Sequence, residues 1–406
     1  MSEVDSTSAA VVLLRPNVRR WVLARLAAGT GSTMMRAVFL WHLYDLSRST
    51  AVLALVGLLS FAPLPVASLL GGLIADAYDR RRLVLVAQTV GLACALALVL
   101  LSRSGMTTVA GMLAIIVTNA TAAALEAPAR QSMLPTLVPK EELSRAVTVM
   151  GTAGALAFMS GPALAGLVLG RAGVAVGYAV AAGLYVASML LVAGVTGGMG
   201  TASKRAVSIA GLKEGLAFVR KQRIVLAAMS IDLFAVIFGG ATALLPVYAN
   251  EILGVGGTGY GILASSFEIG ALATSLLLVT LPPIRRLGRA ILVSVVVYGV
   301  ATVAFGLSRS FPLSLLAYAV AGMADQVSVV GRTTLVQLET PDELRGRVSS
   351  VNMIFIGASN QLSTAEAGFV AYLTTPTFSV VSGGAMVLVV AGVTALLVPA
   401  LWRFRT

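Results

Sequence analysis

The chain is divided by long runs that contain no charged residue. Runs such as Leu83–Ser102 and Ala290–Ser308 reach or approach the roughly 20 residues that an α-helix needs to cross a bilayer. Strands of a membrane barrel would alternate between apolar and polar residues, and these runs do not alternate. With 58% hydrophobic and 11% charged residues, the composition lies outside the range of soluble domains, which are about 25% charged. The sequence therefore predicts an all-α membrane protein.

The uncharged runs, together with apolar regions that each carry one acid, predict twelve membrane-spanning helices. The connections are mostly too short to hold a soluble domain, and the longest, residues 197–222, joins two sets of six. We therefore expect six-helix bundles at residues 1–196 and 223–406, joined by a cytoplasmic linker. The expected spans are Val18–Tyr44, Ala51–Ala75, Leu83–Ser102, Ser104–Leu125, Ala146–Gly170, Ala172–Ser203, Ile224–Asn250, Ile252–Ile284, Ala290–Ser308, Ser310–Gly331, Val348–Leu373 and Thr377–Leu401.

Basic residues are distributed unevenly between the predicted loops. Most of the 29 Lys and Arg fall on the face that holds both termini, and Lys and Arg collect in cytoplasmic loops. Both termini are therefore expected in the cytoplasm, and topology explains the formal charge of +12 without nucleic-acid binding. Cys94 is the single cysteine, which excludes an internal disulfide and a cysteine metal cluster. We expect no metal and no other cofactor.

An internal repeat relates the two predicted halves. Arg130 recurs as Arg332 at an offset of 202 residues, and the same offset relates Gly166 to Gly368. Since six is an even number, both halves insert with the same orientation, which gives parallel repeats related by an axis along the membrane normal. A substrate site is expected near the midplane between such halves.

With this repeat, the chain resembles the major facilitator superfamily over nearly its whole length. The segment Gly72–Arg82 (GLIADAYDRRR) is similar to the superfamily's signature between helices 2 and 3, with Asp79 in place of the usual second Gly. Trp41–Ser47, Arg130–Pro135 and Pro341–Val348 resemble the branch that includes enterobactin exporters and macrolide-efflux proteins. The resemblance implies that helices 1, 4, 7 and 10 line the cavity and that helices 3, 6, 9 and 12 form the outer scaffold.

Charged segments at the helix ends are predicted to form a gate between the halves. The resemblance implies that helix 2 faces helix 11, whose start, Thr340–Glu343, has the pattern of a capping box with Pro at the first turn. Asp76 and Asp79 would then bridge to Arg345 and Arg347 of helix 11. In the other half the loop is basic and the facing helix start is acidic, so Arg286 would pair with Glu142. The alternative is that the arginines only enforce topology. The expected gating residues are Gly72, Asp76, Asp79, Arg80, Arg81, Arg345, Arg347, Glu142 and Arg286.

Charged residues inside the predicted spans carry the functional signal, because an ionisable group at the bilayer centre costs at least about 2.5 kcal/mol. Asp232, Glu268 and Asp325 are expected to bind a proton or another cation. Arg36 is expected to be their counter-charge or to hold an anionic substrate, and the sequence leaves both open. Glu126 and Arg130 lie four residues apart and also fit a structural intrahelical pair. The candidate binding residues are Arg36, Asn119, Glu126, Asp232, Glu268, Asp325 and Glu366.

Gly161, Pro162 and Gly166 in the predicted fifth helix resemble the Gly-Pro motif of exporters that run as antiporters. Pro removes a backbone hydrogen bond, and the glycines permit a bend and close helix contact. Drug–proton antiporters of the superfamily also carry an Arg within helix 4, where this chain has Asn119 and no basic residue before Arg130.

The sequence is interpreted as a bacterial inner-membrane exporter of an amphipathic small molecule, of the drug or siderophore type. We expect it to work by alternating access as a proton antiporter, and to be a monomer among membrane lipids. An importer or a lysolipid flippase of the same fold is the alternative. An enzyme is not expected, because one His and scattered acids do not form a compact catalytic cluster.

Overall fold

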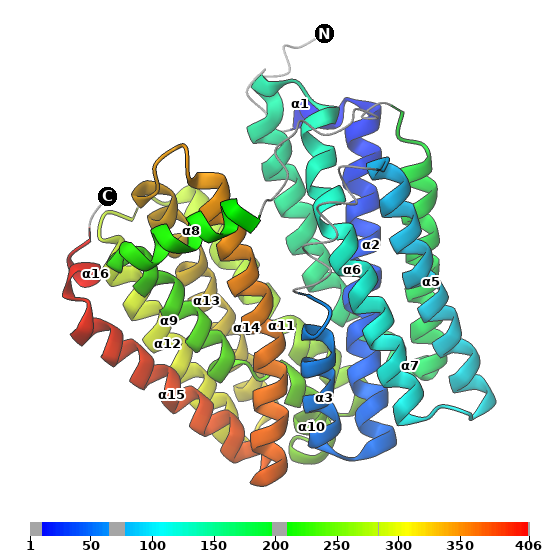
Figure 1. Cartoon of the computed structure of the whole chain (residues 1–406). Helices are drawn as coiled ribbons and strands as arrows, with labels where there is room; N and C mark the ends of the chain where they lie inside the picture. Colours follow the sequence, from blue (N-terminus) through cyan, green and yellow to red (C-terminus); the bar gives the residue numbers. More distant parts are fainter. Residues whose placement is uncertain (1–9, 65–77, 197–208, 283, 405–406) are drawn as a thin grey trace. The chain divides into compact units, whose positions relative to one another are not determined.

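The computed structural model of the 406-residue chain describes residues 10–64, 78–196, 209–282 and 284–404. All regular structure in these ranges is helical, which confirms the predicted all-α class (Figure 1). The longer helices are α2 (Pro16–Ser47), α5 (Arg80–Ser104), α6 (Val109–Leu137), α7 (Leu143–Ala193), α9 (Arg223–Gly239), α11 (Gly256–Thr280), α12 (Leu287–Leu307), α13 (Phe311–Glu339), α14 (Arg345–Leu373) and α15 (Pro376–Leu397). The shorter ones are α1 (Ala10–Leu13), α3 (Thr50–Phe61), α8 (Ile209–Lys221), α10 (Leu245–Val247) and α16 (Pro399–Arg403).

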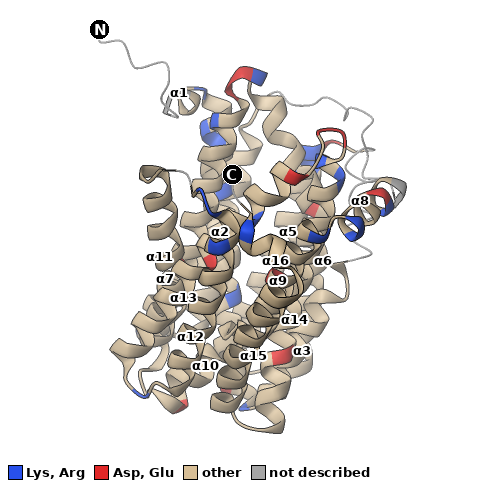
Figure 2. Ribbon diagram, turned by 90° about the vertical axis from the view of Figure 1, so that its left-hand side faces the viewer, with Lys and Arg blue, Asp and Glu red and all other residues tan. Residues whose placement is uncertain are grey.

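Eight helical stretches in the described ranges are long and apolar enough to cross a membrane. α2 and α14 have the length, with 32 and 29 residues, but they contain more polar side chains. Charged residues gather mainly near helix ends and leave long uncharged stretches between them (Figure 2). The twelve spans and the cytoplasmic position of both termini stay predictions. The eight stretches are Arg80–Ser104, Val109–Leu137, Lys140–Ala193, Arg223–Ile252, Gly256–Thr280, Leu287–Leu307, Phe311–Glu339 and Pro376–Leu397.

The repeat found in the sequence extends to the bounds of the helices. Shifted by 202 residues, α6 coincides with α13 at both ends, and each helix has 29 residues. The same shift carries Leu143, the first residue of α7, onto Arg345, the first residue of α14. The repeat therefore holds for both ends of α6 and α13 and for the starts of α7 and α14.

Two of the predicted spans meet in α7. The prediction separated them at Arg171, and two helices within Leu143–Ala193 meet at a kink two residues later. The backbone leaves helical geometry at Gly173, which has φ 76° and ψ −179°. Glycine adopts a positive φ without the steric cost that a Cβ imposes, so the turn between the two spans lies at this residue.

The predicted span Ile224–Asn250 is not one helix. α9 ends at Gly239, and a 3-10 turn (Thr242–Leu244), α10 and a π-turn (Tyr248–Ile252) follow. A side chain at Gly239 would collide with the ring of Tyr298, and one at Gly240 would collide with Ser363. The glycine pair thus allows close packing and interrupts the helix, because glycine is a weak helix former.

The predicted capping box at Thr340–Glu343 is wrong. α14 begins two residues later, at Arg345, and its N-cap Leu344 provides no side-chain hydrogen bond. The Thr340 hydroxyl donates instead to the carbonyl of Val336 at the end of the preceding helix α13. Ser and Thr hydroxyls can donate to the carbonyl four residues before them. Thr340 therefore satisfies a carbonyl at the C-terminal end of α13 and does not cap the N-terminus of α14.

The described residues fall into two compact units, one within Met1–His42 and Ala62–Ala206, the other within Leu43–Phe61 and Val207–Thr406. The first unit has a core that includes Trp21 and Met133, and the second has one that includes Ile231 and Tyr298. α3 belongs to the second unit, where it packs along α14. α8, which lies inside the predicted linker, packs on α9 and α14 (Figure 1). The predicted domain boundaries stay a prediction.

Candidate functional site

Helices α2 and α7 approach each other closely in the first unit. A Cβ at Gly161 would collide with Thr33 on α2, so the contact requires glycine. The Thr33 hydroxyl donates a hydrogen bond of 2.9 Å to the carbonyl of Ala157 on α7. Pro162 lies inside α7 and, lacking an N–H, leaves the carbonyl of Phe158 without its helical donor. The predicted helix-5 motif, which also includes the buried Gly166, therefore lies where α7 packs on α2.

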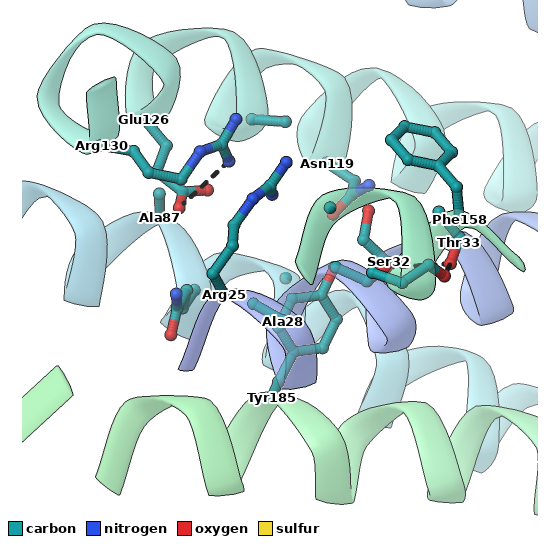
Figure 3. A pocket seen from close by; sticks show the side chains of 16 residues that line it. Arg25, Ala28, Ser32, Thr33, Ala87, Asn119, Glu126, Arg130, Phe158 and Tyr185 are labelled. Carbon is teal, nitrogen blue, oxygen red and sulfur yellow. Dashed lines mark hydrogen bonds and ion pairs between the residues drawn. The ribbon is translucent and has the colours of Figure 1, made fainter. Parts of the chain in front are cut away.

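A cavity of about 220 Å³ lies beside this contact, lined by α2, α5, α6 and α7 (Figure 3). It is smaller than the roughly 300–1,000 Å³ of pockets that enclose a drug-sized ligand. Its volume therefore suits one end of such a molecule, of about the size of a single ring with a polar group. The polar lining residues are Arg25, Ser32, Thr33, Gln88, Asn119, Glu126, Arg130 and Tyr185.

Three charged side chains meet in this cavity. Arg130 Nη1 lies 3.4 Å from Glu126 Oε1 on the same helix, which confirms the predicted intrahelical pair. Arg25 comes from α2, and its side chain extends between this pair and Asn119 (Figure 3). Among the described residues, no acidic oxygen lies within 4 Å of the Arg25 guanidinium. Two arginines and one glutamate give the cavity a formal excess of one positive charge.

Two amide side chains also line the cavity. Gln88 on α5 is buried to 4% exposure, and its Oε1 has no hydrogen-bond partner among the described residues. Asn119 lies on α6, two helical turns before Glu126. Buried polar groups are nearly always hydrogen-bonded, so the unpartnered Gln88 oxygen indicates a place where a bound molecule or water can donate.

In the second unit, a buried ion pair joins α9 to α13. The carboxylate of Asp232 contacts the guanidinium of Arg332, and their side chains are 8% and 2% exposed. Arg36 is the predicted counter-charge of the buried acids, but the cation beside Asp232 is Arg332. Removing one member of such a pair leaves the other charge buried without compensation.

Glu268 on α11 and Asp325 on α13 lie within electrostatic range of each other. Their helices are held close by glycine, because a Cβ at Gly322 would collide with the carbonyl of Phe267, the residue before Glu268. A second contact places Gly270 against the Ala319 carbonyl. Two carboxylates near each other in an apolar surrounding repel when both are ionised. The arrangement therefore favours the protonated form of at least one of the two carboxylic acids.

The remaining predicted binding residues lie apart from these groups. Arg36 is half-buried on α2 of the first unit. Glu366 is half-buried on α14 of the second unit, and its Oε2 has no hydrogen-bond partner among the described residues. Thus Asn119 and Glu126 share one cavity in the first unit, while the acids Asp232, Glu268, Asp325 and Glu366 belong to the second.

The charged segment at the start of α5 is tied to its own unit. Asp79 is the N-cap of α5, where its carboxylate accepts from the Arg82 amide at 3.1 Å. Arg80 is buried and donates to the carbonyl of Ser132 on α6 at 3.0 Å. Arg81 donates to the carbonyl of Ala193 at the end of α7, where the helix dipole favours a cation. Two predicted gating residues, Gly72 and Asp76, lie outside the described residues.

The other predicted gating residues have partners inside their own units or at the surface. Arg15 Nε donates to Glu142 at 2.8 Å, and this hydrogen bond raises the pKa of Arg15. Arg347 contacts Glu214 on α8. Arg345 lies 2.8 Å from the exposed Asp342, and Arg286 is exposed at the N-cap of α12. The predicted bridges between the halves stay a prediction.

Three residues of these sites were not predicted from the sequence. Arg25 and Gln88 were not singled out, and Arg332 was named only as the counterpart of Arg130 in the repeat. Arg332 could have been found through the repeat, because it corresponds to Arg130, which lies beside an acid. No sequence signal pointed to Gln88, since its importance comes from the packing of α5 against α2, α6 and α7.

The fold is shared with solved membrane transporters. A POT family transporter in complex with a thioalcohol-conjugated peptide superposes with a TM-score of 0.73 at 13% identity, covering 95% of this chain and 96% of that one. A bacterial homologue of the human lysosomal transporter Spinster, in an inward-facing and occupied conformation, has a TM-score of 0.73 at 14% identity, covering 95% and 97%. The helical fold of this chain is therefore the fold of these solved membrane transporters.

Comparison with known sequences gives the family. A model described as transmembrane secretion effector matches residues 8–402, and the chain belongs to this family. It is 23% identical over 393 residues to the enterobactin exporter EntS of Shigella boydii serotype 4 (strain Sb227), covering 96% of this chain and 94% of that protein. It is also 23% identical over 343 residues to EntS of Escherichia coli O81 (strain ED1a), covering 84% and 82%. The chain is therefore a multi-pass transporter of the bacterial inner membrane.

Proposed function

We propose that this transporter exports an amphipathic small molecule, of the drug or siderophore type, by proton antiport. The observation that carries the proposal is the placement of Glu268 and Asp325 on two closely packed helices of the second unit. The name of the enterobactin exporters supports the direction and the siderophore class. An importer or a lysolipid flippase is the alternative that the same fold would serve.

In this mechanism the two carboxylates take up a proton when they are accessible from outside and release it when they are accessible from the cytoplasm. Neutralisation by a proton reduces the cost of holding them in an apolar surrounding, so the protonation state favours one conformation over the other. Asp232 is a third proton-binding candidate, and Arg36 and Glu366 remain candidates for binding substrate or proton. The working unit is proposed to be a monomer in the lipid bilayer.

The coupling test uses purified protein in proteoliposomes with an imposed pH gradient and enterobactin or erythromycin as the transported probe. Glu268→Gln and Asp325→Asn should each reduce gradient-driven transport at least tenfold, because an amide cannot exchange a proton. Asp45→Asn is the matched control, since Asp45 is exposed and pairs with the exposed Arg48 nearby. Full gradient-driven transport in both amide variants would show that these acids do not couple transport to protons.

We also propose that Asp76, with a smaller part for Asp79, closes the cytoplasmic side against Arg345 and Arg347. A sign-exchanged copy would pair Glu142 with Arg286, in competition with the Arg15 contact of Glu142. Asp76→Asn should then shift the population toward the inward-open state. Labelling of single cysteines at Ser144 and Gly346, after replacement of Cys94, measures this opening. If labelling and transport in Asp76→Asn are both unchanged, the gate does not exist and the arginines of this segment serve only to orient the helices in the membrane.

A further inference from the structure

We infer that the cavity of the first unit binds the anionic end of the transported molecule and accepts a hydrogen bond from a donor close to that charge. The inference rests on the proposed function, which requires a substrate site, and it goes further by stating the chemistry of the bound group. It concerns a cavity in the first unit, separate from the acids of the second unit that are proposed to couple transport.

The balance of charge in the cavity favours an anion. Glu126 lies beside Arg130 and offsets its charge, while Arg25 has no acidic oxygen within 4 Å among the described residues. Arg25 and Arg130 thus share the single carboxylate of Glu126. A cation that is only partly compensated within a membrane-spanning helix is costly, and a bound carboxylate would reduce that cost. The planar guanidinium presents two parallel N–H donors, which match the two oxygens of a carboxylate.

Glycine leaves room for a ligand on one side of the Arg25 guanidinium. A Cβ added at Gly154 on α7 would meet only Nη2 of Arg25, at 3.9 Å. A Cβ added at Gly29 on α2 would lie 3.9 Å from Nη1 but would collide with the Cβ of Ala157 at 2.7 Å, so the space beside Gly29 is filled by Ala157. The Nη2 side of the guanidinium therefore stays accessible to a bound group.

A second observation points to the donor. Gln88 is buried to 4% exposure, lines the cavity and has an Oε1 without a hydrogen-bond partner among the described residues. A ligand hydroxyl or N–H close to the anionic group would satisfy this oxygen. Phe158 and Tyr185 add aromatic surface to the lining, and the volume of about 220 Å³ accommodates one aromatic ring. The best fit is therefore a hydroxylated aromatic acid at the end of a larger molecule.

Among the described residues of the second unit, the position that corresponds to Arg130 has no excess positive charge. Arg332, related to Arg130 by the repeat, is buried in a direct ion pair with Asp232 from another helix. That pair is already neutral. The excess of positive charge is therefore a property of the first-unit cavity and does not follow from the repeat.

The test measures binding by isothermal titration calorimetry to the purified full-length protein in detergent at pH 7, without any gradient. The probes are benzoate, 3-hydroxybenzoate and benzamide, which separate the charge, the hydroxyl donor and the ring. The hydroxyl of 3-hydroxybenzoate is too far from its own carboxylate to bond to it. We expect 3-hydroxybenzoate to bind at least threefold more tightly than benzoate, and benzamide at least tenfold more weakly than benzoate.

Variants assign these effects to the two side chains. Arg25→Ala should weaken binding of both acids at least tenfold. Arg25→Lys should retain only part of the wild-type affinity, because an ammonium group lacks the two parallel N–H donors of the guanidinium. Gln88→Leu should remove the advantage of 3-hydroxybenzoate over benzoate. Arg103→Ala, which removes an exposed arginine at the end of α5, is the control and should bind like the wild type.

Either of two results would overturn the inference: benzamide binding as tightly as benzoate, or unchanged acid binding in Arg25→Ala and Arg25→Lys that elute from gel filtration like the wild type. Binding is measured without a gradient, so it does not depend on proton coupling. If wild-type protein binds the acids as expected but its transport does not respond to a pH gradient, the proposed antiport alone is overturned. If wild-type protein shows proton-driven transport but binds benzamide as tightly as benzoate, this inference alone is overturned.

Discussion

Asp232 combines a proposed chemical role with a structural one. Its carboxylate is the counter-charge of Arg332, and both side chains are buried in the second unit. Asp232→Asn should therefore lower the free energy of unfolding by roughly 3–5 kcal/mol, because it leaves a buried guanidinium uncompensated. Thermal melting in detergent measures this loss, and the double variant Asp232→Asn/Arg332→Gln should regain part of it. A wild-type melting temperature in the single variant would show that the pair contributes nothing to stability.

At this scale the sequence predicted which acids lie within spans, because charge in an apolar run is visible without a structure. It did not predict their partners. Asp232 and Arg332 are 100 residues apart in the chain, and only the packing of α9 with α13 brings them together. Glu126 and Arg130 could be paired in advance, since residues four apart meet on one helix face.

Helix packing decides whether Glu268 and Asp325 interact. The Gly322 contact with the Phe267 carbonyl sets how closely α13 approaches α11. Gly322→Ala should force the helices apart, cost about 1–3 kcal/mol of stability and reduce pH-driven transport severalfold by separating the two carboxylates. Gly392→Ala is the matched control, because a Cβ at Gly392 on α15 meets nothing within 4 Å. Equal transport in the two variants, measured in proteoliposomes, would contradict this account of the packing.

Helix existence was predictable, but helix starts and interruptions were less so. Long apolar runs predicted α5, α12 and α15 closely, since hydropathy alone identifies them. The start of α14 was misplaced because the Thr340 side chain bonds backward to α13. The break after Gly239 was missed because it depends on Tyr298 and Ser363 from other helices.

The whole molecule is a membrane transporter of two repeated halves, and its fold followed from the repeat and the apolar runs. Its candidate sites divide between the units: a positively charged cavity in the first and two carboxylates on closely packed helices in the second. The central claim is that substrate movement in one direction is tied to proton movement in the other through Glu268 and Asp325.

The most direct measurement follows protons and substrate in the same proteoliposomes. An outward or inward gradient of enterobactin is imposed at equal pH, and a pH-sensitive dye inside the vesicles reports proton movement. Wild-type protein should move protons opposite to the substrate. The double variant Glu268→Gln/Asp325→Asn should exchange labelled for unlabelled substrate without moving protons. Undiminished proton movement in the double variant, or substrate transport without proton movement in the wild type, would contradict the account.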